Sequence, residues 1–141
     1  MPGQASQDES AGGELPCPAS PPAVNHDMLR LALIDAGQRV AAAVEEPDRF
    51  PAARERIARF CYAELLPHLE ADEHWLLEAR HCTEGRLIAE AIMTEARAMT
   101  AAVHELADAT DPCQAVAAIR VLHALLAAHA HHEQLLLAPG G

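Results

Sequence analysis

Aromatic residues are scarce in this 141-residue chain, at 3%, and β-branched residues are sparse among its apolar residues, many of which are alanine. β-sheets favour aromatic and β-branched side chains, whereas alanine is the best helix former. The composition therefore predicts an all-α protein whose helices pack closely through small side chains. A chain of this length is expected to form one domain with a core that needs no disulfides.

Positive charge is also scarce, because 10 Lys and Arg residues face 21 Asp and Glu residues, giving a formal net charge of −11. This disfavours nucleic acid and anionic membrane surfaces as partners, since both select basic patches. The four cysteines include no CxxC pair, which argues against a zinc ribbon or a thioredoxin-like motif, and we expect no intramolecular disulfide. Without a signal-peptide pattern or an apolar run approaching ~20 residues, a cytoplasmic protein is predicted.

The order of segments predicts a tail followed by a helical domain. Residues 1–24 are rich in Gly, Ser, Pro and acids and hold almost no large apolar side chain, so a disordered tail is expected. Residues 25–139 are expected to form four helices, at about 26–45, 51–80, 84–108 and 112–138. Because short connections make consecutive helices antiparallel neighbours, the prediction is an up-down-up-down antiparallel four-helix bundle.

Apolar residues spaced three or four apart mark the inner face of each predicted helix. The first helix has Leu29, Leu33, Val40 and Val44 on this stripe, with Gly37 among them as a point of close contact. The second helix has the longest stripe: Ile57, Cys61, Leu65, His68, Asp72, Trp75 and Ala79. Pro67 lies inside that helix and is expected to bend it just before His68, because proline cannot donate a backbone hydrogen bond.

Two pairs of possible metal ligands lie on these stripes. His68 and Asp72 are four residues apart, as are His129 and Glu133, and this spacing puts each pair on one helix face. Imidazoles and carboxylates on inner helix faces are the ligands of metals buried in bundles. Counting ~1.5 Å of rise per residue along the antiparallel helices brings both pairs and His26 into one layer. The sequence therefore predicts a metal site with five ligands from three helices.

Each histidine also has a simpler explanation. His26 can be a first-turn histidine that faces solvent. The histidines near the C-terminus of the last helix can interact with the helix dipole when protonated. We prefer this surface role for His131 and His132, and the ligand role for His129 and Glu133, because only the latter pair shares the predicted layer.

Three motifs resemble the hemerythrin-like domains, also called HHE cation-binding domains: HDMLR at 26–30, LLPHLEADE at 65–73 and HAHHEQLLLAP at 129–139. The resemblance implies an up-down four-helix bundle around a non-haem di-iron centre. It would make His26, His68 and His129 terminal iron ligands, and Asp72 and Glu133 the carboxylates that bridge the irons. Such domains bind oxygen, sense oxygen, redox state or iron, or handle nitric oxide.

The third helix departs from the family pattern. The family often has a metal-binding histidine in an AEHR-like stretch, whereas this chain has TEAR at 94–97 and therefore Ala96 at that position. Glu95 is a possible substitute ligand or a surface residue, and Asp72 replaces a longer glutamate. One iron would then be under-coordinated, open to water or absent.

Three functions remain open at this point. The first is a hemerythrin-like protein with one or two non-haem irons that binds dioxygen or another small redox ligand as sensor or carrier. The second is a di-iron enzyme with ferroxidase or peroxide-consuming activity. The third is a degenerate bundle that has lost part or all of its metal site and serves as an interaction module, a reading that Ala96 favours.

Overall fold

The computed structural model describes residues 26–79 and 85–137, and within these ranges the chain is helical and has no β-strand. The prediction of an all-α protein is therefore confirmed. The expected disordered tail, together with Cys17 and Cys82, lies outside the described residues, whereas Cys61 and Cys113 are free thiols. The helices are α2 (His26–Ala42), α3 (Phe50–Phe60), α4 (Leu66–Ala79), α5 (Arg86–Ala107) and α6 (Pro112–Leu137).

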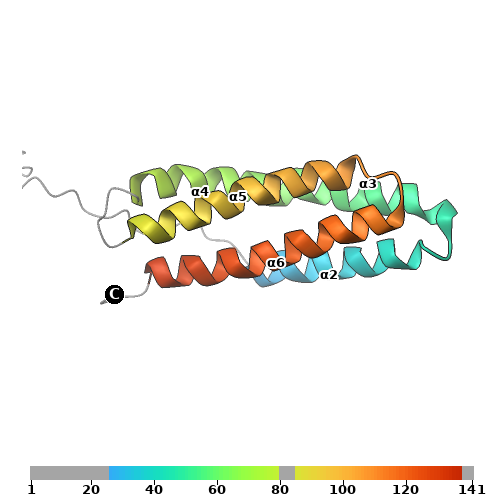
Figure 1. Cartoon of the computed structure of the whole chain (residues 1–141), viewed down its shortest axis with the longest axis horizontal. Coiled ribbons are helices and arrows are strands. Elements are labelled where there is room, and N and C mark those ends of the chain that lie inside the picture. The colour runs from blue at the N-terminus through green and yellow to red at the C-terminus, as the bar shows by residue number, and fades with distance from the viewer. Residues whose placement is uncertain (1–25, 80–84, 138–141) are drawn as a thin grey trace, which may run out of the picture.

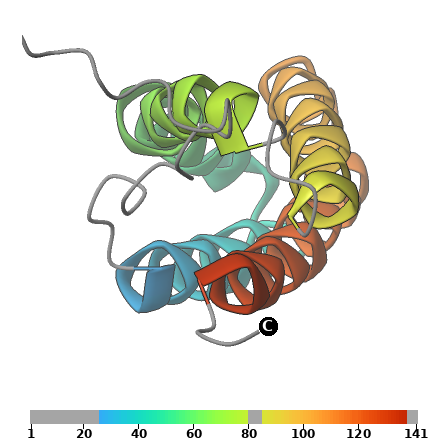
Figure 2. The same cartoon turned by 90° about the vertical axis from the view of Figure 1, so that its left-hand side faces the viewer.

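The helices of the described residues form four long stretches. These stretches lie side by side along the length of the molecule (Figure 1). One of them is composite, because α3 continues through a π-helical turn, Cys61–Leu65, into α4. Seen end-on, the stretches surround a common centre, with α6 between α2 and α5 (Figure 2). α5 and α6 share the most extensive contact, and α6 also packs along α2.

The start of α6 is fixed by side chains that bind its free backbone groups. Asp111 Oδ1 accepts a hydrogen bond from the backbone N–H of Gln114 at 2.9 Å, and Gln114 Oε1 accepts one from the N–H of Thr110 at 2.8 Å. This arrangement resembles a capping box, which satisfies N–H groups that the first helical turn leaves without partners. The start predicted for the last helix, at about residue 112, thus coincides with its observed start at Pro112.

α2 packs closely on α6 at Gly37, as its place on the apolar stripe predicted. A Cβ atom added at Gly37 would lie 3.3 Å from Ile119 Cγ2, so the missing side chain lets the two helices approach. The prediction that Val44 belongs to this inner stripe is wrong, since its side chain is 53% exposed. α2 ends at Ala42, and the turn that follows buries Ala43 instead.

The π-helical turn ends at Leu65, two residues before Pro67. The backbone N–H of Leu66 bonds to the carbonyl of Cys61, five residues earlier, instead of the usual four. A π-turn adds a residue to the local turn and commonly marks positions where a helix changes the direction of its side chains. The missing N–H of Pro67 thus coincides with this local widening, and His68 follows on the first turn of α4.

The buried apolar side chains form two clusters along the bundle. The larger one joins α2, α3, the π-helical turn, the first turn of α4, α5 and α6, and it includes Leu33, Leu65, Met99, Leu122 and Leu126, which are almost fully buried. Burying each such side chain contributes about 1.5–3 kcal/mol. The smaller one consists of Trp75, Leu76, Ala89, Ile92 and Met93, from α4 and α5.

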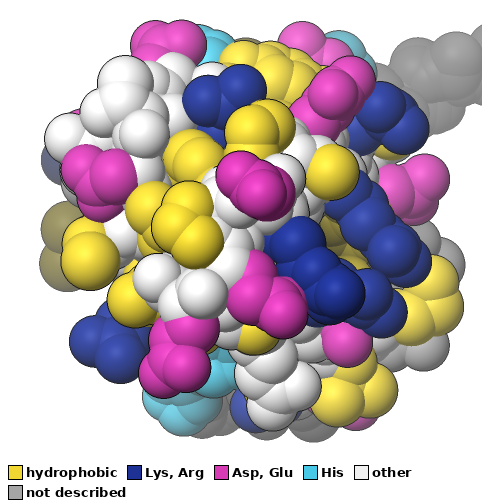
Figure 3. All heavy atoms as spheres, turned by 90° about the vertical axis from the view of Figure 1, so that its right-hand side faces the viewer, with side chains coloured by type: hydrophobic (Ala, Val, Ile, Leu, Met, Phe, Trp, Pro, Cys, Tyr) yellow, Lys and Arg dark blue, Asp and Glu magenta, His cyan; other side chains and the backbone are white. Residues whose placement is uncertain are grey.

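The end of the molecule at the right of Figure 1 carries acidic and basic side chains close together (Figure 3). Arg49 pairs with Glu46 at 3.0 Å, and Arg54 donates a hydrogen bond at 2.8 Å to the carbonyl of Ala109, which follows α5. Arg54 also lies over the ring of Phe50, 5.5 Å from its centroid. Arg54 therefore ties the start of α3 to the connection between α5 and α6.

One helix of the described part, Pro112–Leu136 in α6, is long and apolar enough to cross a membrane by length and composition. No apolar run of this length was expected from the sequence, in which Arg120 and several histidines interrupt the stretch. Leu122, Leu126 and His129 on the same helix are buried in the bundle, and core helices of soluble proteins have a similar composition.

Candidate metal site

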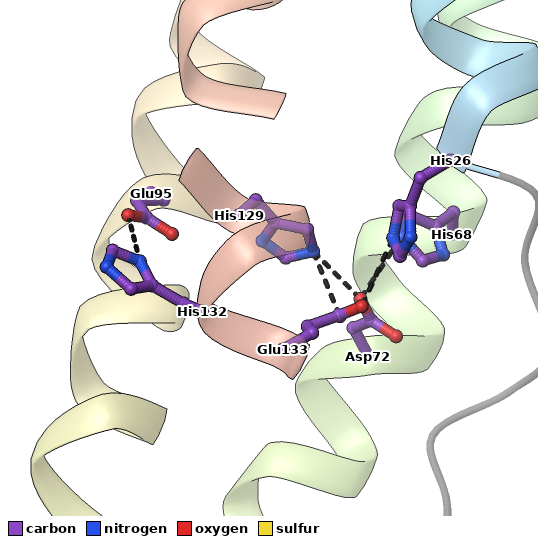
Figure 4. Close-up of polar contacts among 7 residues, drawn as sticks. All are labelled: His26, His68, Asp72, Glu95, His129, His132 and Glu133. Carbon is purple, nitrogen blue, oxygen red and sulfur yellow. Dashed lines mark hydrogen bonds and ion pairs between the residues drawn. The ribbon is translucent and has the colours of Figure 1, made fainter. Parts of the chain in front are cut away.

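Three helices bring the predicted ligand residues together at the point where α2 begins (Figure 4). His26 is the first residue of α2, His68 and Asp72 lie one turn apart on α4, and His129 and Glu133 lie one turn apart on α6. The first-turn position of His26 does not expose it fully, since its side chain is 23% accessible. The other four side chains are almost completely buried. We call these five residues the His/acid cluster.

The three imidazoles of the cluster present the same ring nitrogen, Nε2, to the two carboxylates. His26 Nε2 lies 3.1 Å from Glu133 Oε1, and His68 Nε2 lies 3.1 Å from Asp72 Oδ2. His129 Nε2 lies 3.0 Å from Asp72 Oδ2 and 3.1 Å from Glu133 Oε2. One ligand atom from each of His26, His68, His129 and Glu133 can be chosen so that all four lie within 4.8 Å of one another.

Most of these short contacts are not hydrogen bonds. Only His129 and Asp72 have hydrogen-bond geometry, whereas His26 Nε2, His68 Nε2 and Glu133 Oε2 are buried atoms without a hydrogen-bond partner. Asp72 Oδ1 is also buried and also lacks a hydrogen-bond partner. Buried polar atoms without partners are costly, and each one calls for an explanation such as a bound ion. A cation at the meeting point of these atoms would give them a common partner.

Charge within the cluster is distributed unevenly. Burial lowers the pKa of His68 to about 4, because it disfavours the charged imidazolium. Burial acts in the same direction on His129, but the hydrogen bond with Asp72 and the contact with Glu133 outweigh it and raise its pKa to about 9. Without metal, the cluster therefore keeps a positive charge on His129, between two carboxylates.

The two carboxylates respond in opposite ways to the same surroundings. Burial raises the pKa of Asp72 above its usual range. Burial also acts to raise the pKa of Glu133, but the contacts with His129 and His26 outweigh burial and hold this pKa well below its usual range. Glu133 is thus the carboxylate that stays charged and available to a cation.

The possible substitute ligand Glu95 lies outside the cluster. Its Oε2 atom is 2.7 Å from Nδ1 of His132, on the side of α6 away from His26 and His68 (Figure 4). The sequence predicted a surface position for His132 and gave no sign of this pair, because the contact depends on how α5 and α6 align. The side chain of His132 is only 31% exposed.

Position 96, where the resemblance to hemerythrin-like domains predicted a histidine that this chain lacks, borders a groove between α4 and α5. The groove has a volume of about 260 Å³, and its lining includes Leu66, Leu69, Met93, Ala96 and Arg97. α5 therefore contributes no ligand to the cluster. The part of the chain that the structure describes holds one group of metal-type ligands with this spacing, and every member comes from α2, α4 or α6.

Trp75, the only tryptophan of the chain, lies one turn beyond Asp72 on α4. Its side chain is buried, and Nε1 has no hydrogen-bond partner. The apolar stripe predicted its burial. Its nearness to the cluster makes it a natural fluorescent reporter.

In comparisons with known proteins, no family model, no curated protein and no solved structure matches this chain.

Proposed function

We propose that this chain is a hemerythrin-like non-haem iron protein, built as an up-down-up-down antiparallel four-helix bundle. It would bind iron in the His/acid cluster and use it to bind dioxygen or a related small redox ligand, as a sensor or carrier. The observation that carries this proposal is the convergence of three imidazoles and a carboxylate, from three helices, on a buried point where His26 Nε2, His68 Nε2 and Glu133 Oε2 lack hydrogen bonds.

The donor set fits iron chemically. Imidazole nitrogen and carboxylate oxygen together suit iron, manganese and zinc, and soft thiolate ligands are absent from the cluster. Iron, when bound, supplies the redox chemistry and the affinity for small oxygen-type ligands. The chain's own residues hold it, with Glu133 charged and His68 neutral, as ligands must be.

Access to the cluster is uneven, which suits a small ligand. The side chains of Asp72 and His129 are fully buried, whereas that of His26 is 23% exposed. Ligand entry is therefore proposed beside His26, where α2 begins. The apolar side chains on the other sides exclude bulk water, which limits loss of a reactive ligand to solvent.

The proposal is tested by iron content and by ligand binding. Metal-free protein is loaded anaerobically with ferrous iron and passed through a desalting column, and the iron retained per chain is measured. The wild type should retain iron and show a change in visible or near-ultraviolet absorption with dioxygen or nitric oxide. His129→Ala should retain little iron, whereas the control His74→Ala, at an exposed position on α4, should behave like the wild type.

A second candidate function is that of a degenerate bundle that acts as an interaction module. Ala96 favours this candidate, because it leaves α5 without a metal ligand. In that case the wild type and His129→Ala would both lack iron and show no absorption change.

A further inference from the structure

We infer that the His/acid cluster binds a single transition-metal ion and not a bridged pair. This inference rests on the proposed function, since it concerns how many ions the same residues hold. It departs from the two irons that the family resemblance implies.

The spacing of the donor atoms fits one ion. Metal–nitrogen and metal–oxygen bonds are about 2.1 Å long, so two ligand atoms on one ion are roughly 3.0 Å apart at right angles and about 4.2 Å apart when opposite. The contacts of His26 and His129 with Glu133 are 3.1 Å, and all four candidate atoms lie within 4.8 Å of one another. A small movement would bring every one of them within bonding distance of one point.

A second ion would need further ligands that the described residues do not provide. Two metals in a shared site lie about 3.5–4 Å apart, and each needs its own terminal ligands. The helix that could supply them, α5, presents Ile92, Ala96 and Met99 on its inner face, and Glu95 is engaged with His132. Within the cluster, Asp72 Oδ1 has no hydrogen-bond partner, but this single further donor would not hold a second ion.

The role of Asp72 also differs in the one-ion arrangement. In a bridged pair it would bind both metals, whereas here its Oδ2 contacts His68 and His129 and it is not among the four atoms that share one point. Its Oδ2 lies against the same Nε2 atoms that would bind the ion, so Asp72 would complete the shell of that ion as one more ligand.

The test counts ions with the full chain. Metal-free protein, at a concentration well above the dissociation constant, is titrated anaerobically with ferrous iron and separately with zinc, while Trp75 fluorescence is followed. The break should come at one equivalent, and native mass spectrometry should show one mass step. After oxidation, the iron form should give the paramagnetic resonance signal of an isolated high-spin ferric ion.

Two variants sharpen the result. Asp72→Asn should still bind one equivalent, with an affinity roughly 10- to 100-fold weaker, and Glu133→Gln should bind much less, with circular dichroism confirming that each is folded. A break at two equivalents, with an oxidised form silent in paramagnetic resonance, would overturn the one-ion inference and leave the proposed function standing. Absence of any binding would overturn both.

Discussion

Glu95 Oε2 on α5 lies 2.7 Å from His132 Nδ1 on α6, one residue before Glu133 of the cluster. This contact aligns α5 with α6 beside the cluster and directs the carboxylate of Glu95 away from it. Ala96, the next residue on α5, then occupies the position where hemerythrin-like domains, which the sequence motifs resemble, often have a histidine.

We expect Glu95→Gln to leave metal binding unchanged, because Glu95 contacts His132 and not the cluster. The pair is partly exposed, so the free energy of unfolding should fall by less than ~1 kcal/mol. Iron content and urea unfolding measure the two effects. Loss of iron in this variant would instead make Glu95 a ligand.

Ala96→His should allow a second ion to bind. The groove beside position 96 offers space for an imidazole, so the cost should lie at the low end of the ~1–3 kcal/mol typical of overpacking. The variant is expected to be less stable than the wild type without iron and at least as stable with it, and iron should rise towards two per chain. Thermal unfolding with and without iron, and metal analysis, measure these effects.

The control for this substitution is Ala98→His, which places the same side chain at an exposed position of α5. Its iron content should equal that of the wild type. If Ala96→His and Ala98→His bind the same amount of iron, a side chain at position 96 does not reach the His/acid cluster.

Gly37→Leu should weaken both the fold and the metal site. A side chain at Gly37 meets Ile119, so a leucine must push α2 away from α6 and with it His26 from Glu133. We expect a loss of about 1–3 kcal/mol in unfolding free energy and a several-fold weaker metal affinity. The control Gln38→Leu, at the exposed neighbouring position, should change neither the unfolding free energy nor the metal affinity. If Gly37→Leu and Gln38→Leu have equal effects, the added hydrophobic side chain and not the contact with Ile119 is the cause.

The metal-free protein should lose stability as the pH rises from 7 to 9. The folded-state pKa of His129, about 9, lies above its ordinary value of 6.5, so its contribution is complete below about pH 6.5 and lost as the pH approaches and passes 9. His68, with its pKa lowered to about 4, contributes stability above pH 6.5 that is lost as the pH falls through 4, outside this window.

Urea unfolding in the presence of a chelator, followed by Trp75 fluorescence, measures this dependence. His129→Gln should flatten the profile between pH 7 and 9, and His104→Gln, at an exposed position, should not. Metal affinity should rise over the same range, because ligand histidines must give up their proton. A stability that increases from pH 7 to 9 would contradict the charge assigned to His129.

The periodicity of apolar residues was enough to predict the helices and most of the inner face. Ile57, Cys61, Leu65, His68 and Asp72 are all buried as the stripe required, because a spacing of three or four residues keeps side chains on one helix face. The prediction failed at Val44, where the chain leaves the helix early. End positions depend on local turns that the apolar pattern does not encode.

The alignment of one helix with another was harder to predict than the helices themselves. Counting rise per residue placed His26, His68 and His129 in one layer, and the structure brings them together. The pairing of Glu95 with His132 was missed, because it depends on side-chain packing between α5 and α6. Whether the assembled residues bind metal stays a prediction.

The cluster joins the first and last described helices, since His26 opens α2 and Glu133 lies near the end of α6. An ion held by both would act as a reversible cross-link that closes a loop of roughly 100 residues. Closing a loop of this length restricts the unfolded chain strongly, by an amount comparable with a long-range disulfide. Pulled from its two ends in a force experiment, the loaded protein should therefore resist extension until the ion is released, and metal supply would set its mechanical lifetime.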